Sequence, residues 1–149
     1  MEERIAPTFP LIRIRGSATV REAAQLISDL SIGALGVDGP DHVFIGLFTE
    51  RDLAWTIAQG RDPLTTKVEE VVNDLPVVVD GPITISEAAR RMTDAHVRHL
   101  LIRTDEELRI VSMRNLIRDY VESQPGHATH TASAAEMRRW YSGASSTIR

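Results

Sequence analysis

The stretch Gly46-Leu47-Phe48-Thr49-Glu50-Arg51-Asp52-Leu53 decides the fold of this chain. Small and apolar residues run directly into a hydroxyl, an acid, a base and a second acid, and a helix-compatible segment follows. This order predicts a buried strand that stops at the N-terminus of a helix, with Thr49 at the cap and Asp52 in the first turn. A helix N-terminus presents unpaired backbone N–H groups and a partial positive charge, so it favours anions.

A second, altered copy of this stretch ends an internal repeat. The first part of the repeat aligns at a shift of 65 positions, where Gly16, Thr19 and Glu22-Ala23-Ala24 fall on Gly81, Thr84 and Glu87-Ala88-Ala89. The second part aligns at a shift of 63, where Thr49, Arg51 and Leu53 fall on Ser112, Arg114 and Leu116. These matches keep one order with one small gap, which indicates a duplicated unit.

Both copies predict the same order of elements. β-Branched and aliphatic runs predict strands at 11–14 and 77–79. Capping boxes, Thr19 with Glu22 and Thr84 with Glu87, predict helices at 20–30 and 85–95. The elements that follow are a hairpin, at 35–37 with 43–48 and at 99–103 with 108–111, and a second helix, at 51–58 and 114–121.

The duplicated β-α-β-β-α unit has about fifty residues and is too small to hold a stable core alone. Two units packed sheet to sheet, with pseudo-two-fold symmetry, would bury what one cannot, so we expect an α/β (α+β) fold. We place the first repeat at 1–62, the second at 63–123 and a C-terminal tail at 124–149. Ser133 and Glu136 favour a short helix in the tail, which we expect to be flexible or to dock through that helix.

The composition limits the compartment and the class of partner. The chain has 149 residues, no Cys and a formal net charge of -4. The absence of Cys, of a signal-peptide pattern and of a bilayer-long apolar run leads us to expect a cytoplasmic protein without membrane association. The acidic balance argues against nucleic acid as a partner. We find no nucleophile with a His partner, no glycine-rich phosphate loop and no metal-ligand cluster, so we expect no catalytic or metal-binding residues.

The two repeats, with Thr-x-x-Glu-Ala-Ala opening the first helix and Gly-h-h-Thr-x-x-Asp closing the hairpin, resemble the CBS domain, named for cystathionine β-synthase. The pair resembles the tandem arrangement called a Bateman module, over about 11–122. The resemblance implies a regulatory module and not an enzyme. It also implies an adenosine-containing ligand, such as AMP, ATP, NAD or S-adenosylmethionine, in a cleft between the repeats, with no required cofactor.

The resemblance further implies roles for individual residues. In the family, the carboxylate of the Thr/Ser-x-x-Asp motif holds the ribose, the hydroxyl and nearby basic residues meet the phosphate, and apolar strand residues surround the adenine. Here Asp52 and Thr49 take the first two roles, with Arg51 beside them and Ile14 among the strand residues. Arg98 and His99 resemble a basic pair that contacts phosphates in some members.

The second copy of the motif departs from the family pattern. Asn115 replaces the Asp and loses the charge-assisted bond to the ribose, which is worth about 1–2 kcal/mol, or roughly tenfold in affinity. We therefore expect the cleft at Ser112 and Asn115 to be the weaker one, or empty. Arg109 replaces the Gly of the motif and is expected to crowd a place where family members have no side chain.

Each candidate residue also has a structural interpretation. The pairs Thr49 with Asp52 and Ser112 with Asn115 are plain helix caps, and Arg98 with His99 is a solvated strand edge. The alternative function is a nucleotide-free interaction module that binds a protein partner through the tail. The resemblance to a Bateman module also implies a homodimer that pairs through the second helices. We expect its contact near the apolar and aromatic residues Trp55, Ile57, Ile117 and Tyr120.

Overall fold

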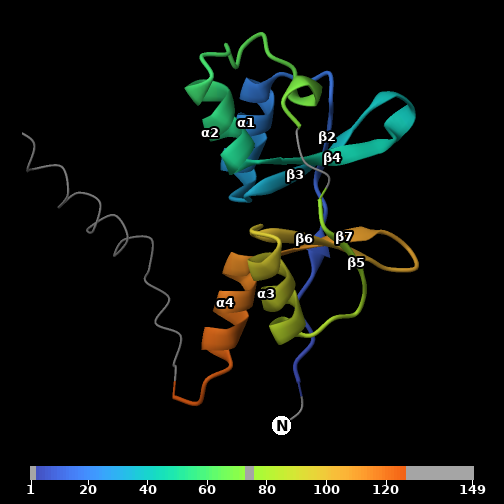
Figure 1. Cartoon of the computed structure of the whole chain (residues 1–149), viewed down its shortest axis with the longest axis vertical. Helices are drawn as coiled ribbons and strands as arrows, with labels where there is room; N and C mark the ends of the chain where they lie inside the picture. Colours follow the sequence, from blue (N-terminus) through green and yellow to red (C-terminus); the bar gives the residue numbers. More distant parts are fainter. Residues whose placement is uncertain (1–2, 73–75, 127–149) are drawn as a thin grey trace, which may run out of the picture. The chain divides into compact units, whose positions relative to one another are not determined.

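The computed structural model of the chain describes residues 3–72 and 76–126. Its elements are β1 (Phe9–Pro10), β2 (Arg13–Arg15), α1 (Val20–Leu30), β3 (Ala34–Asp38), η1 (Pro40–His42), β4 (Phe44–Thr49), α2 (Glu50–Ala58), η2 (Val68–Glu70), β5 (Val78–Asp80), α3 (Ile85–Asp94), β6 (His99–Arg103), β7 (Leu108–Ser112) and α4 (Met113–Glu122) (Figure 1). The predicted β-α-β-β-α order is confirmed in both halves, and every predicted boundary lies within two residues of the observed one. The predicted tail helix lies outside the described residues.

Two units can be distinguished, Met1–Leu116 and Ile117–Arg149, and the first contains both sheets. The first sheet has the order β2-β3-β4, and the second has the order β1-β7-β6-β5. In each sheet a parallel pair, β2 with β3 or β5 with β6, is joined through a helix, and an antiparallel hairpin follows. This is the arrangement that parallel neighbours require, because they need a crossover connection. The α/β fold class is confirmed.

Strand β1 was not predicted from the sequence. It has only two residues, one of them proline, and pairs with β7 through Phe9 and Ile110. Just before it, the Ala6 N–H donates to the Ile83 carbonyl at 2.9 Å. The chain therefore starts in the second sheet before β2 begins the first.

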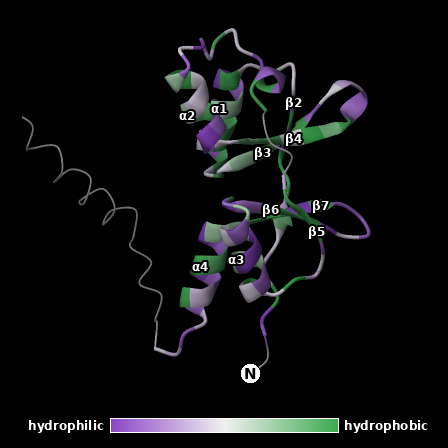
Figure 2. Cartoon of the chain, viewed as in Figure 1, coloured by the Kyte–Doolittle hydropathy of each residue, from purple (hydrophilic) through white to green (hydrophobic). Residues whose placement is uncertain are grey.

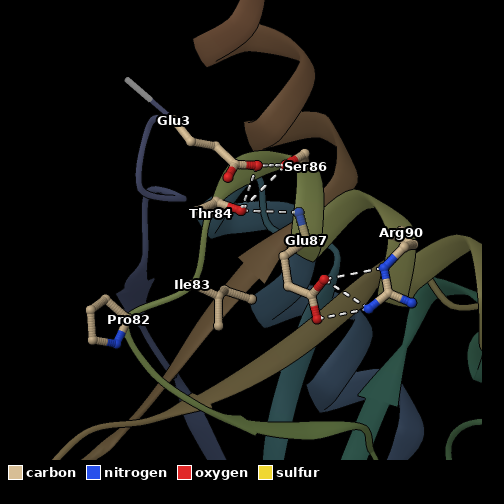
Figure 3. A pocket seen from close by; sticks show the side chains of 7 residues that line it. All are labelled: Glu3, Pro82, Ile83, Thr84, Ser86, Glu87 and Arg90. Atoms are coloured by element: carbon tan, nitrogen blue, oxygen red, sulfur yellow. Dashed lines mark hydrogen bonds and ion pairs between the residues drawn. The ribbon is translucent and has the colours of Figure 1, made fainter. Parts of the chain in front are cut away.

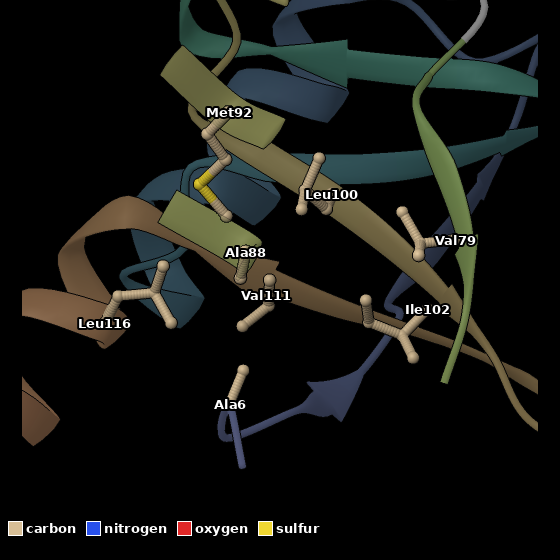
Figure 4. Close-up of a cluster of buried hydrophobic side chains, with 8 residues drawn as sticks. All are labelled: Ala6, Val79, Ala88, Met92, Leu100, Ile102, Val111 and Leu116. Atoms are coloured by element: carbon tan, nitrogen blue, oxygen red, sulfur yellow. The ribbon is translucent and has the colours of Figure 1, made fainter. Parts of the chain in front are cut away.

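Two separate cores hold these sheets. The first contains Val20, Ala23, Ile27, Leu35, Val37, Phe48, Val68 and Val71. The second contains Ala6, Val79, Ala88, Met92, Leu100, Ile102, Val111 and Leu116, whose side chains converge in Figure 4. In Figure 2 strands β3 and β4 of the first sheet are mostly apolar, whereas the helices carry both apolar and polar residues, as one-sided burial requires. Each core thus also takes residues from a segment outside its own sheet and helices.

The central strands are buried on both faces. Side chains alternate between the faces of a strand, yet consecutive residues in β3 and in β6 are all shielded from solvent: Ala34, Leu35, Gly36 and Val37 in the first, and Leu100, Leu101 and Ile102 in the second. One face of each strand meets its core. The other face is also covered, which agrees with the predicted sheet-to-sheet packing.

The two predicted capping boxes have different outcomes. At α1 the box is complete, because the Glu22 N–H donates to Thr19 Oγ1 at 3.1 Å and the Thr19 N–H donates to Glu22 Oε2 at 2.8 Å. At α3 only half of the prediction is right. The Glu87 N–H donates to Thr84 Oγ1, but the Glu87 carboxylate binds Arg90 and Arg91 instead of the cap backbone.

An acid from the N-terminal segment takes part at the start of α3. The hydroxyls of Thr84 and Ser86 both donate to Glu3 Oε1, and Figure 3 shows the Glu3 side chain turned toward them. The charged carboxylate lies close to the helix N-terminus, where a negative charge is stabilising. Glu3 thereby fastens the start of the described chain to the second repeat.

The backbone conformation explains the glycine of the opening stretch. Gly46 has φ 155°, and it lies where the pairing of β3 with β4 shifts by one residue, so that Asp38 opposes Phe44. Such a bulge favours glycine. The second hairpin pairs without a shift, from His99 opposite Ser112 onward, and therefore needs no glycine at position 109.

The Arg109 side chain binds the N-terminal segment. Its Nε donates to Thr8 Oγ1 at 2.9 Å, one terminal nitrogen donates to the Thr8 carbonyl at 3.1 Å, and the other binds Glu107. The guanidinium therefore lies along the segment that leads into β1. The substitution of the family's glycine strengthens the attachment of the N-terminal segment.

The expected dimer residues Trp55, Ile57, Ile117 and Tyr120 are all exposed, so Trp55 is not a core residue. The homodimer itself stays a prediction. Across residues 3–72 and 76–126, no helix is both long and apolar enough to span a bilayer. Over the same ranges, no group of three or more His, Cys, Asp or Glu side chains is arranged to hold a metal ion.

Candidate functional site

The opening motif forms a complete helix cap at the start of α2. Asp52 Oδ2 accepts from the Thr49 N–H at 2.7 Å and from Thr49 Oγ1 at 3.0 Å, and the Asp52 N–H donates to Thr49 Oγ1 at 3.4 Å. The structural interpretation of the motif is therefore confirmed. The cap also fixes where the Asp52 carboxylate points, because one of its oxygens is held against the strand end.

A cavity of about 170 Å³ lies at this helix start. It is lined by residues of both repeats: Leu47, Thr49, Arg51, Asp52, Pro76, Val77, His96, Val97, Arg98 and His99. Five of the eight predicted site residues are thus brought together, namely Thr49, Arg51 and Asp52 from the first repeat and Arg98 and His99 from the second. The carboxylate and the basic pair, far apart in the sequence, line one cavity.

The other lining residues were missed by the sequence analysis. Leu47 is the strand residue beside Phe48 and has the opposite orientation, so its place in the opening stretch could have indicated it. Val97 directly precedes the predicted basic pair. His96 follows the C-terminal cap of α3 with a left-handed φ of 53°, and no sequence pattern marked it. Together these residues add apolar surface and a second imidazole.

Three predicted residues lie outside the cavity lining. Ile14 packs against the first core. Ser112 Oγ accepts from the Asn115 N–H at 3.2 Å, which is the capping interaction expected at the start of α4. The binding roles of Ile14, Ser112 and Asn115 stay predictions.

His99 lies against the first repeat. A Cβ added at Gly33 would come within 3.1 Å of His99 Nε2 and 3.6 Å of Glu50 Oε1, so a side chain at position 33 would press on the imidazole. Burial lowers the pKa of His99, with the positive charges of Arg98 and Arg114 adding to the effect and the Glu50 carboxylate opposing it. The imidazole is therefore held mainly neutral near pH 7.

This environment makes stability depend on pH. Below about pH 6.5, the ordinary pKa of His, the unfolded chain takes up a proton at position 99 that the folded chain resists. The free energy of unfolding should therefore fall as the pH falls from 7.5 to 5.5. His99→Gln should flatten this fall, which urea unfolding at several pH values would measure.

His42 provides the matched control for this measurement. It is exposed in the hairpin between β3 and β4, with a left-handed φ of 58° that Asn tolerates. His42→Asn should leave the pH dependence as steep as in the unchanged protein. An equally steep fall in His99→Gln would contradict the assignment to His99.

Comparison with known proteins identifies the repeats. The family model described as CBS domain matches residues 3–58 and 68–122, most of the chain. Hypoxic response protein 1 of Mycobacterium tuberculosis is 32% identical over 91 residues, which cover 60% of this chain and 64% of that protein. The chain thus spans slightly less than two thirds of that relative's length.

Solved structures agree with the family match. The CBS-domain containing protein ATU1752 from Agrobacterium tumefaciens superposes with a TM-score of 0.68 at 25% identity, covering 75% of this chain and 85% of that one. The CBS domain protein PAE2072 from Pyrobaculum aerophilum, complexed with AMP, superposes with a TM-score of 0.63 at 20% identity. That alignment covers 90% of this chain and 93% of the other, and at this identity it shows the fold alone.

Proposed function

Because this chain belongs to the CBS-domain family, with two CBS domains in tandem, we propose that it is a regulatory module that binds an adenosine-containing ligand. The observation that carries the proposal is the cavity shared by Asp52 and Thr49 of one repeat and Arg98 and His99 of the other. The ligand belongs to the class of AMP, ATP, NAD or S-adenosylmethionine. Its effect on a partner would come from a different affinity for two arrangements of the module.

The cavity provides the chemistry that such a ligand needs. Leu47, Val77 and Val97 offer apolar surface to a base, and the fixed Asp52 carboxylate can accept hydrogen bonds from ribose hydroxyls. The start of α2 and the guanidiniums of Arg51 and Arg98 favour phosphate. The cavity volume of about 170 Å³ in this structure is below the roughly 300–1,000 Å³ of most ligand pockets. We therefore expect the exposed arginine side chains to move outward on binding.

A thermal-shift panel tests this proposal. AMP, ADP, ATP, NAD and S-adenosylmethionine are added separately, and GMP at matched ionic strength controls for a general anion effect. A ligand at a hundredfold excess over its Kd stabilises the folded state by about 2.7 kcal/mol. For a chain of this size that is a rise in Tm of roughly 5–10 °C.

The absence of an adenosine-specific shift in Tm would contradict the proposal. If no adenosine-containing compound raises the Tm more than GMP does, the cavity is not an adenosyl site. AMP is the first compound to try because the Pyrobaculum neighbour was solved with it.

A further inference from the structure

The charges around the cavity favour an anionic ligand. Among the described residues of the lining, Arg51 and Arg98 are cationic, His96 and His99 are imidazoles, and Asp52 is the one acidic side chain. A ligand that carries a phosphate balances this set. A ligand whose reactive end is cationic, such as a sulfonium, adds to the existing positive charge.

His99 faces charged groups from every element packed against it. Glu50 of α2 is the nearby acid, Arg98 directly precedes His99 at the start of β6, and Arg114 of α4 is the third charged group that acts on His99. Arg51, Asp52 and His96 share its cavity. Burial and the two arginines lower the pKa of the imidazole by more than the Glu50 carboxylate raises it. The ring therefore lacks enough nearby negative charge to hold a proton.

A phosphate in the cavity supplies that missing charge. The cavity is small and His99 forms part of its wall, so an anion that enters it comes close to the imidazole. The attraction between a phosphate dianion and an imidazolium favours the protonated ring. The ring also lies close to Gly33 of the first repeat, where an added Cβ would come within 3.1 Å of His99 Nε2.

We propose that the cavity binds a phosphorylated nucleotide together with one proton, which His99 takes up from solvent. The inference rests on the proposed function and adds a regulation to it, because binding then strengthens as the surroundings become more acidic. It also narrows the ligand class to phosphate esters and excludes the sulfonium compound. Arg98 alone would give no such dependence, because a guanidinium stays charged throughout this range.

Calorimetric titration with AMP tests the coupling. Titrations at pH 7.0 in two buffers with different ionisation enthalpies give the number of protons bound per AMP, which should lie clearly above zero and not exceed one. Between pH 8 and pH 6.5 the Kd should fall by up to about tenfold per pH unit. The phosphate of AMP, with a pKa near 6, would release protons on binding as a dianion, so uptake identifies a base on the protein.

Three variants locate that base. His99→Gln should bind AMP without proton uptake and with a Kd that no longer falls between pH 8 and pH 6.5, because only the small proton release of the phosphate remains. Its thermal unfolding shows that it is folded. His42→Asn should behave as the unchanged protein. Proton uptake that persists in His99→Gln, or that disappears only in His96→Asn, overturns the inference.

Failure of this inference can be told apart from failure of the proposed function. AMP binding without proton uptake overturns the coupling and leaves the adenosyl site standing. Binding of S-adenosylmethionine but not of AMP would likewise overturn the coupling and leave the adenosyl site standing. No binding of AMP or any other panel compound at any pH overturns both.

Discussion

Asp52→Ala is expected to abolish nucleotide binding, whereas Asn115→Ala should leave it nearly unchanged. Asp52 lines the cavity and carries the charged acceptor for the ribose, whereas Asn115 lies outside the cavity lining. The milder change Asp52→Asn keeps the shape and removes the charge, so it should weaken binding about tenfold. Titration of each variant with AMP measures these effects.

Asp52 also caps α2, so its replacement alters stability as well as binding. Loss of one capping interaction costs about 1 kcal/mol. Glu22→Ala is the matched control, because Glu22 occupies the same position of the capping box at α1 and is not part of the cavity lining. It should lower stability to a similar extent and leave the Kd unchanged. Equal loss of binding in Asp52→Ala and Asn115→Ala, or none in Asp52→Ala, would contradict the site assignment.

Phe48→Ala should have the largest effect on stability. Among the described residues, Phe48 is the largest fully buried side chain, and it belongs to the first core together with residues of α1 and the two valines of the connector. Removing a buried phenylalanine destabilises a protein by about 3–5 kcal/mol. That is a large part of the 5–15 kcal/mol of a typical domain. Urea unfolding followed by circular dichroism would measure the change.

Phe44→Ala is the control on the same strand. Phe44 is only half-buried, and its ring lies 5.3 Å from the guanidinium carbon of Arg13. A contact of this kind contributes about 0.5–1 kcal/mol, so the loss should be clearly smaller than for Phe48→Ala. Similar losses in both variants would mean that the first core is not packed as described.

Local patterns were the predictable part of this fold. Thr19 with Glu22 and Thr49 with Asp52 stand three residues apart, and a capping box needs nothing beyond that spacing and a following helix. The prediction failed in part at Glu87, because Arg90 and Arg91 lie one turn away on the same helix and compete for the carboxylate. Local competition of this sort is visible in the sequence, but its outcome is decided by geometry.

Contacts between segments that are far apart in the sequence could not be predicted. The pairing of Phe9 with Ile110 joins segments that no periodicity links, and a proline such as Pro10 is unusual in a strand other than an edge strand. The cavity likewise depends on contacts between segments that are far apart in the sequence. Thr49, Arg51, Asp52, Arg98 and His99 could be named because they stand in motifs that resemble those of the CBS domain, whereas Pro76, Val77 and His96 depend on how the two repeats meet.

The attachment of the N-terminal segment to the second sheet has a consequence for synthesis. Ala6 and Phe9 leave the ribosome roughly a hundred residues before Val111 and Ile110, which at 5–20 residues per second is a delay of about 5–20 s. During that interval the first core can close with Val68 and Val71, while the partners of Ala6 do not yet exist. The first repeat can therefore fold first during synthesis, whereas the segment around Ala6 and Phe9 stays unpaired until β7 emerges from the ribosome.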